Sequence, residues 1–141
     1  MKRLAILAAV YLGLSVVGGA VFTERVVHRA TRNPITVNDR AAAADLAATP
    51  GASLETVSVS GDDGAALRGW LSTPGPPNTH PLLLLHGITS NRAAMTSAAR
   101  LFLEAGYRTL AVDLRAHGDS DGEYGVSGPR EADDARRWIA W

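Results

Sequence analysis

The sequence predicts an α/β protein, and three features in the second half of the chain support this prediction. The four leucines Leu82–Leu85 form a short apolar run typical of a strand covered on both faces of a sheet. A helical pattern follows at residues 91–105, and another apolar run at residues 107–114 predicts a second strand. A strand, a helix and a strand in this order form a βαβ unit, whose strands are parallel and whose crossover is right-handed in nearly all cases.

The size and composition of the chain exclude several functional classes. Its 141 residues are enough for one folded domain at most. The 14 Lys and Arg residues balance the 14 Asp and Glu residues, and no basic run indicates a nucleic-acid surface. Because the chain has no cysteine, thiol catalysis, disulfides and thiolate metal sites are excluded. From the balanced charge and the lack of a basic run, we expect no nucleic-acid partner.

The most hydrophobic segment is the uncharged run at residues 4–22. As a helix it would be roughly 28 Å long at about 1.5 Å per residue, close to the hydrocarbon thickness of a bilayer. We expect a transmembrane anchor. The alternatives are a cleaved export signal, for which Gly18, Gly19 and Ala20 offer small residues near a cleavage site, and a buried soluble helix. The folded part is expected outside the cytoplasm, either anchored in the membrane or exported after cleavage.

A polar, alanine-rich linker is predicted at residues 23–53. One short helix is expected within it, around residues 41–48, capped by Asn38 or Asp39. The expected organisation is therefore a transmembrane or signal segment at 1–22, a linker at 23–53 and a folded domain at 54–141.

The folded domain begins with a predicted β-hairpin. Residues 54–60 alternate between apolar and polar side chains, the GDDG sequence at 61–64 is typical of a turn, and residues 65–72 read as the second strand. A proline-rich loop at 74–81 separates this hairpin from the βαβ unit.

The crossover helix is expected to begin after Ser90 or Asn91 and to end at Gly106. Its predicted apolar face consists of Ala94, Ala98, Leu101, Phe102 and Ala105. Pro129 opens a last helix, whose predicted apolar side consists of Ala132, Ala135, Trp138 and Ile139.

Residues 118–122 read GDSDG and match the G-x-S-x-G signature of a serine-hydrolase nucleophile. A nucleophile elbow joins a strand directly to a helix, so that the turn exposes the serine hydroxyl. Here the motif lies several residues after the predicted strand, and no helix begins before Pro129. Asp119 and Asp121 would also place negative charge beside a developing oxyanion. We therefore do not expect Ser120 to be the nucleophile.

Two other combinations of reactive residue types occur in this region. Asp113, His117 and Ser120 lie within one short loop, which makes a preorganised triad improbable. His86, Asp113 and His117 lack the spacing of a zinc site. The chain also has no G-x-x-x-x-G-K-[ST] sequence and no G-x-G-x-x-G sequence between a strand and a helix, which are the two glycine-rich signatures of phosphate binding. We expect no metal and no cofactor.

The order of these motifs resembles the first half of an α/β-hydrolase domain. The resemblance is carried by LLLLHGITSN at residues 82–91 and GYRTLAVDLRAHGDSDG at residues 106–122. In that family an apolar strand runs into a His-Gly turn, a helix ends at Gly-Tyr, and the next strand ends in Asp-x-Arg-x-His-Gly-x-Ser. The resemblance extends over residues 54–141 and is nearest to the serine aminopeptidase-like and esterase-like hydrolases, many of which carry an N-terminal anchor or signal.

The resemblance also implies roles for individual residues. Gly87 and Ile88 would form the oxyanion loop, with the Ile88 N–H donating to the tetrahedral intermediate. His86 would hold this turn and would not act as the catalytic base. The cleft-lining or structural residues would be His86, Asp113, Arg115, His117 and Ser120. Leu82–Leu85 would lie at an unpaired apolar edge of the sheet.

The function implied by the resemblance is hydrolysis of an ester, thioester or amide through an acyl-enzyme. In this family the nucleophile lies on the strand after the last predicted helix, so the catalytic triad is expected beyond Trp141 and the chain alone is expected to be inactive. We expect the N-terminal part of a membrane-anchored or exported serine hydrolase, with a small-molecule or peptide acyl substrate and a membrane contact at residues 4–22. The alternative is a non-catalytic, membrane-tethered protein that depends on a binding partner.

Overall fold

A mixed β-sheet organises the folded part of the chain. The structure is a computed structural model that describes residues 2–27, 32–76, 80–122 and 128–141. Within these residues the sheet has four strands in the order β1-β2-β4-β3: β1 Ser53–Ser60, β2 Ala66–Thr73, β4 Thr109–Val112 and β3 Leu82–Leu85. β2 is antiparallel to β1 and β4, whereas β3 is parallel to β4. The predicted α/β class, with a hairpin followed by a βαβ unit, is confirmed.

The turn between β1 and β2 forms as its sequence predicts. The Gly61 N–H donates to the Ala65 carbonyl at 2.8 Å, and the Gly64 N–H donates to the Gly61 carbonyl at 3.1 Å. Gly64 has a φ of 81°, in the left-handed region that glycine adopts without a Cβ penalty. This turn sets the register in which Ser60 lies opposite Ala66.

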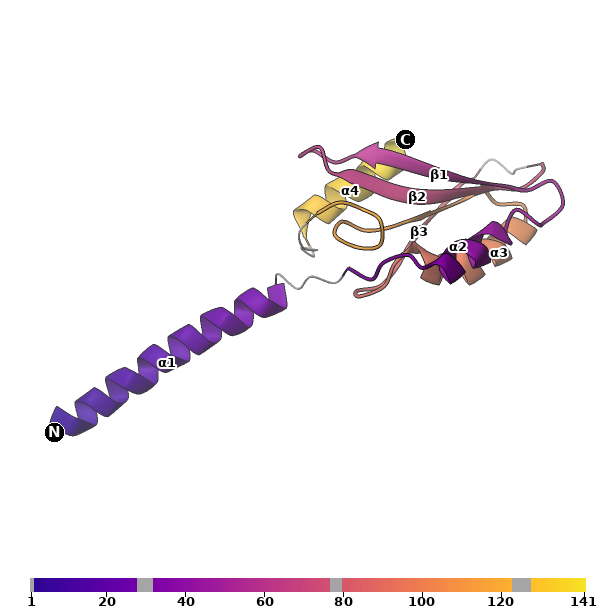
Figure 1. The fold of residues 1–141 in the computed structure, drawn as a ribbon. Coiled ribbons are helices and arrows are strands. Elements are labelled where there is room, and N and C mark those ends of the chain that lie inside the picture. The colour runs from indigo at the N-terminus through magenta and orange to yellow at the C-terminus, as the bar shows by residue number, and fades with distance from the viewer. Residues whose placement is uncertain (1, 28–31, 77–79, 123–127) are drawn as a thin grey trace.

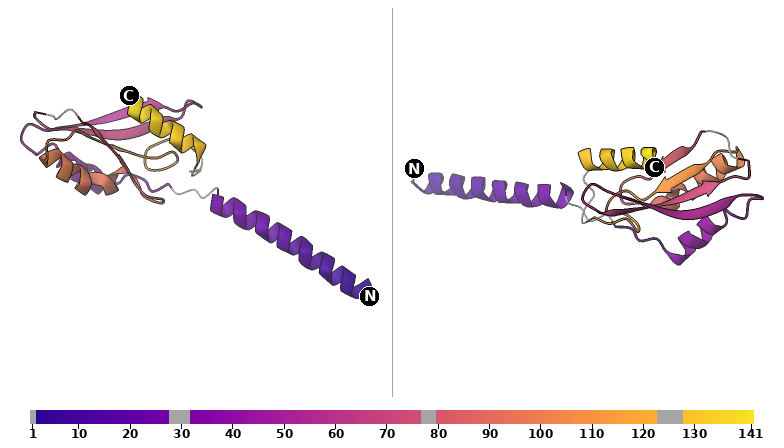
Figure 2. Two further views of the ribbon diagram at one scale, coloured as in Figure 1. Left: turned by 180° about the vertical axis from the view of Figure 1, so that it is seen from behind. Right: turned by 90° about the horizontal axis from the view of Figure 1, so that it is seen from above.

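Helices cover both faces of the sheet (Figure 1). On one face lie α2 (Val37–Ala44) and α3 (Thr96–Glu104), and on the other lies α4 (Pro129–Ala140), as the view from above shows (Figure 2). Trp138 of α4 packs on Leu67, Leu110 and Val112 of the sheet. Two buried clusters form on the opposite face. The first consists of Ile35, Ala43 and Trp70, and the second consists of Leu46, Ala99 and Leu103.

The segment before β1 packs against the sheet, although the sequence predicted a linker there, at residues 23–53. Ile35, Ala43 and Leu46 are buried in the core. The helix begins at Val37, earlier than predicted, and its cap is Thr36, whose hydroxyl accepts the Asp39 N–H at 3.2 Å. The segment has few large apolar residues, so its periodicity is weak, and its burial depends on the surface that the distant β2 offers.

α3 buries a different face from the predicted one. Ala99 and Leu103 are buried, whereas Leu101 is 65% exposed. Before the helix, the Asn91 side chain caps a 3₁₀ turn, η1 (Arg92–Met95). Ala99 and Leu103 form the buried face because they pack with Leu46 and against Leu54 and Leu84 of the sheet.

α1 (Lys2–Val27) is a continuous helix that projects away from the folded part of the chain (Figure 1). The apolar side chains of residues 4–22 are exposed. The stretch Lys2–Arg25 is long and apolar enough to cross a membrane by length and composition, and none of it is buried inside the protein. A membrane anchor and a signal sequence both fit this description, and the helix extends beyond the predicted residues 4–22.

Candidate active site

The predicted site residues gather at the carboxyl ends of β3 and β4. Residues 86–88 follow β3 and residues 113–120 follow β4. Because the two strands are parallel, both loops emerge at the same edge of the sheet, where ligands bind in many α/β proteins. The rings of His86 and His117, one from each loop, have centroids 5.1 Å apart.

His86 holds the first loop to the second. Its Nε2 accepts the Leu114 N–H at 3.1 Å, so the ring proton of the neutral form lies on Nδ1, which donates to the Gly87 carbonyl at 2.8 Å. Burial lowers the pKa of His86 below its usual value. The neutral imidazole therefore braces the turn, with both nitrogens engaged.

The turn after His86 presents its backbone to the outside. A Cβ added at Gly87 would meet nothing within 4 Å, and Ile88 is 73% exposed. Thr89 has a φ of 64°, and the Ser90 N–H donates to the Gly87 carbonyl at 3.3 Å. Among the hydrogen bonds within the described part of the chain, none is donated by the Ile88 N–H.

Asp113, the first residue after β4, is fully buried and saturated with donors. Its carboxylate accepts the backbone N–H groups of Arg92, at 2.7 Å, and of Asp119, at 2.8 Å. It also forms an ion pair with the Arg92 guanidinium, and neither side chain is exposed. Asp113 therefore ties the start of the crossover helix to the loop after β4.

A second carboxylate, Asp119, extends this network towards α2. It pairs with Arg92 at 2.7 Å and with Arg40 at 2.9 Å. Burial alone would raise the pKa of Asp119, but the hydrogen bonds from Arg92 and Arg40 outweigh it and lower the pKa. The Arg92 guanidinium also lies over the Trp70 ring, 4.4 Å from its centroid. Sequence reasoning missed both arginines, because nothing local distinguishes them from solvent-exposed helix residues.

The GDSDG loop needs its first glycine for steric reasons. Gly118 has a φ of 49°, and a Cβ at this position would collide with the Asp113 carboxylate. The loop can therefore close over the buried carboxylate only with glycine here.

Ser120 is fully buried. Its hydroxyl donates to the Asp113 carbonyl at 2.9 Å and accepts the Arg68 N–H at 2.9 Å. The next residue, Asp121, donates its N–H to the Ala66 carbonyl at 2.9 Å. The loop thus continues the pairing with β2 beyond the end of β4, and the Ser120 hydroxyl is one of its links.

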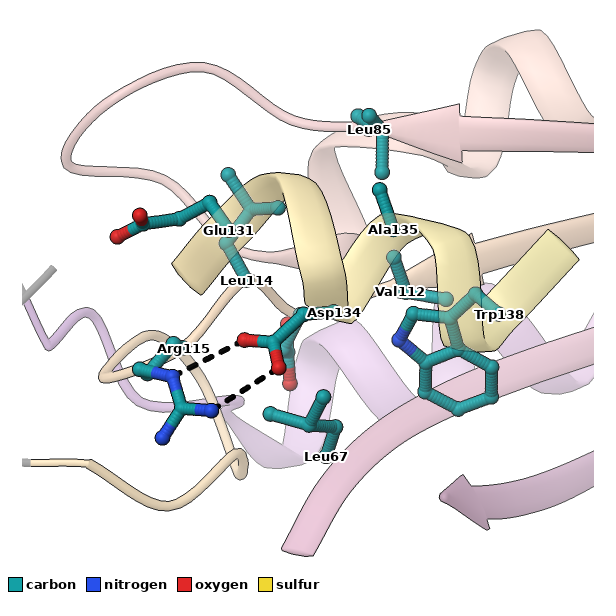
Figure 3. Close-up of a pocket in the computed structure, with 10 residues that line it drawn as sticks. Leu67, Leu85, Val112, Leu114, Arg115, Glu131, Asp134, Ala135 and Trp138 are labelled. Carbon is teal, nitrogen blue, oxygen red and sulfur yellow. Dashed lines mark hydrogen bonds and ion pairs between the residues drawn. The ribbon is translucent and has the colours of Figure 1, made fainter. Parts of the chain in front are cut away.

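Arg115 points towards α4 and pairs with Asp134 there (Figure 3). Its guanidinium donates to the two Asp134 oxygens at 3.0 and 2.9 Å and to Asp63 at 2.7 Å, and these bonds raise its pKa. The pair explains why α4 buries Asp134, whereas Ala132 and Ile139, from the predicted apolar side, are exposed. Between Arg115, Leu85 and Trp138 lies a cavity of about 10 Å³, room for about one water molecule.

His117 is buried, and its Nδ1 lies 2.8 Å from the Arg115 carbonyl. Across the described ranges, no group of three or more His, Cys, Asp or Glu side chains is arranged to hold a metal ion. Hydrogen bonds link His86, Asp113 and Ser120 to the backbone of the surrounding loops, and residues 87–89 are exposed beside them.

The sheet and the two braced loops define an α/β-hydrolase fold. An esterase from Pyrococcus furiosus is similar with a TM-score of 0.63 and 30% sequence identity, over 78% of this chain and 40% of the esterase chain. An alpha-beta hydrolase from Vibrio vulnificus has a TM-score of 0.64 and 22% identity, over 84% of this chain and 40% of its own, and supports the fold.

Residues 29–141 match the X-Pro dipeptidyl-peptidase (S15) family, and the chain belongs to this family. The predicted α/β-hydrolase resemblance is confirmed by the match to the S15 family and by the similarity to the esterases. The match begins before β1, in agreement with the packing of residues 32–52 on the sheet. The chain spans 40% or less of the length of the Pyrococcus furiosus esterase chains, and a search of curated proteins found no relative.

Proposed function

We propose that this chain is the N-terminal part of a membrane-tethered serine hydrolase that cleaves an ester, thioester or amide through an acyl-enzyme. The observation that carries the proposal is the turn at Gly87 and Ile88, which exposes its backbone at the carboxyl end of β3 in a chain of a hydrolase family. Two hydrogen bonds of His86 hold this turn in place.

The proposed chemistry assigns this turn to the oxyanion. A serine hydroxyl attacks the substrate carbonyl, the Ile88 N–H donates to the resulting oxyanion, and the alcohol, thiol or amine leaves with a proton. Water then attacks the acyl-enzyme and releases the acid. Gly87 leaves space for the substrate to approach the backbone, because it carries no side chain.

The nucleophile in this proposal is not Ser120. Its hydroxyl is buried and already bonds to Asp113 and Arg68, and freeing it would leave both backbone groups unsatisfied. The catalytic serine, the acid and the catalytic histidine are proposed to lie outside residues 1–141, in the part that the longer similar esterases also contain. His86, Asp113, Arg115, His117 and Ser120 then serve as the scaffold of the cleft.

The proposed localisation follows from α1. Its length and composition suit a bilayer-spanning helix, and we propose that it remains as an anchor with the folded part outside the cytoplasm. Cleavage of α1 as a signal would instead give an exported hydrolase with the same site. N-terminal sequencing of the protein purified from cells distinguishes the two, because an anchor retains residues 4–22.

A fluorophosphonate probe tests the function on the native protein in its membrane. We expect a labelled serine other than Ser120, located by mass spectrometry, and equal labelling of the Ser120→Ala variant. Loss of labelling in Ser120→Ala, with an unchanged thermal melting curve, would overturn the assignment of Ser120. A native protein that folds, resists the probe and hydrolyses no p-nitrophenyl ester would support the non-catalytic, partner-dependent alternative.

A further inference from the structure

The segment that follows α1 is fastened to the candidate site. The Arg32 guanidinium donates to the carbonyl oxygens of Ser120 and Gly122, both at 3.0 Å. The Asn91 amide donates to the Asn33 carbonyl at 3.0 Å. The first described residues after α1 therefore contact both loops at the carboxyl edge of the sheet, the one after β3 and the one after β4.

Chain length limits how far this edge can lie from the end of α1. Val27 ends the helix, and Arg32 follows five Cα steps later, which span at most about 18 Å when fully extended. The helix has 26 residues and is therefore about 39 Å long, so its last turns lie at the surface of a bilayer that it crosses. The Arg32 side chain and its hydrogen bond add roughly 10 Å, so the loop after β4 lies within roughly 30 Å of the end of α1.

Apolar side chains near this edge are exposed. Ile88, in the proposed oxyanion turn, is 73% exposed. Val37 is 83% exposed and lies three residues after Pro34, whose carbonyl lies 3.5 Å from the Asn91 amide. Such side chains are stabilised when they enter the headgroup and acyl boundary of a bilayer.

We infer that the carboxyl edge of the sheet faces the bilayer, with Ile88 and Val37 at its surface, and that the acyl substrate is an ester of a membrane lipid. The inference rests on the proposed function and deepens it. An oxyanion turn tethered this close to the membrane, with an apolar residue exposed beside it, receives an ester carbonyl whose acyl chain is delivered from the bilayer. Hydrolysis breaks the acyl–oxygen bond, the lipid alcohol leaves with a proton, and water supplies the oxygen of the released fatty acid.

The orientation can be tested without any enzymatic assay. The sequence contains no cysteine, so Ile88→Cys and, separately, Leu101→Cys can each carry a fluorophore on the native protein. Leu101 is a matched control, apolar and 65% exposed, and it lies on α3 towards the opposite end of β4. In vesicles of phosphatidylcholine and phosphatidylglycerol with nitroxide-labelled headgroups, we expect several-fold stronger quenching at residue 88. Equal quenching, or a label shielded without lipid quenching, would overturn the orientation.

The substrate class is tested with a variant outside the catalytic loop. Val37→Asp places a carboxylate in the first turn of α2, which suits the helix dipole and preserves folding. Hydrolysis of phosphatidylglycerol in vesicles is expected to fall about tenfold, the effect of losing a valine-sized apolar contact. Hydrolysis of soluble p-nitrophenyl acetate is expected to be unchanged, and Leu101→Asp is expected to affect neither substrate.

The two proposals fail in different ways. Hydrolysis of p-nitrophenyl acetate without hydrolysis of vesicle lipid would overturn the lipid substrate and leave the hydrolase function standing. Hydrolysis of neither substrate would overturn the hydrolase function and the lipid substrate together, while the contrast in quenching between residues 88 and 101 would still decide the orientation. An equal loss on both substrates in Val37→Asp would show that this residue acts on the fold and not on the membrane contact, which contradicts the inference.

Discussion

Arg92 and Asp113 form a fully buried ion pair that joins the start of the crossover helix to the end of β4. The same guanidinium lies over the Trp70 ring of β2 and pairs with Asp119 in the loop beyond. One side chain thus connects β2, the helix start and the GDSDG loop, and this scaffold positions the turn that we propose for the oxyanion.

Asp113→Asn should lower the free energy of unfolding by about 3 to 5 kcal/mol, because it leaves the buried Arg92 charge without its buried partner. Asp119→Asn is the matched control, since the Asp119 side chain is 32% exposed, and its effect should be about 1 kcal/mol. Guanidinium denaturation of the two variants measures the difference. Equal effects would contradict the dominant role of the buried pair.

Gly118→Ala should destabilise the protein far more than Gly64→Ala. Both glycines have a left-handed φ, so each alanine costs about 1 to 2 kcal/mol of backbone strain. Only at Gly118 would the new Cβ also collide with the Asp113 carboxylate, whereas at Gly64 it meets nothing within 4 Å. The difference in melting temperature between the Gly118→Ala and Gly64→Ala variants measures the cost of the collision. Equal melting temperatures would argue against a collision.

The stability of the protein should depend on pH through His86. Burial lowers the pKa of His86 in the folded state, and the unfolded value is about 6.5. The unfolded chain therefore binds more protons below that pH, so the contribution of His86 is complete above about 6.5 and is lost as the pH falls. Melting temperatures measured between pH 7 and 5 should decline in the wild type.

The His86→Gln variant is the control for this pH dependence. Its side-chain oxygen can accept the Leu114 N–H but cannot be protonated in this range, so the decline between pH 7 and 5 should flatten. Asp119, whose pKa is lowered, should contribute to a separate loss at more acidic pH, below its unfolded value of about 4, in both proteins. An unaltered profile in the variant would show that another group titrates.

Ser120→Ala should reduce stability without abolishing activity. Removing the hydroxyl leaves the Arg68 N–H and the Asp113 carbonyl without their partner, which costs about 1 to 3 kcal/mol. Urea denaturation measures the loss, and hydrolysis of a soluble ester by the complete protein measures the activity. A variant that keeps its full stability but loses activity would show that Ser120 has a catalytic role and not a structural one.

In the proposed hydrolase, Ile88→Pro should lower kcat by about 10² to 10³, because proline removes the proposed oxyanion donor. Ile88→Ala keeps the N–H and should retain kcat on a soluble ester to within a few-fold. Circular dichroism of both variants checks that the fold is kept. Comparable losses of kcat in the two variants would mean that the Ile88 side chain matters and its N–H does not.

The elements that local patterns specify were predicted well. Leu82–Leu85 forms the predicted strand, and the GDDG turn at residues 61–64 joins two antiparallel strands. Pro129 opens the last helix as predicted. The resemblance to the α/β-hydrolases implies cleft-lining or structural roles for His86, Asp113, Arg115, His117 and Ser120. These roles stay predictions, as do those of Gly87 and Ile88, and the structure shows that both loops emerge at one edge of the sheet because β3 and β4 are parallel.

The errors occurred where a distant contact decides the outcome. The sequence predicts a linker at residues 23–53 because this stretch is polar and rich in alanine, yet Ile35 and Leu46 fill space against the sheet. The buried face of α4 includes Asp134, which a hydrophobic pattern excludes, because Arg115 supplies its partner there. The burial of Arg92 has no local signal either, because its partners Trp70, Asp113 and Asp119 come from β2 and from the loop after β4.

The sequence by itself determined the strands, the turn, the apolar N-terminal helix and the order of the hydrolase motifs, because each depends on periodicity, turn chemistry or spacing within a short window. Only the tertiary structure decided which polar groups are buried, and that the segment after α1 is bonded to both candidate-site loops through Arg32 and Asn33. Burial of a charge is stabilising only when its partner is in place, and here the partners lie far apart in the chain.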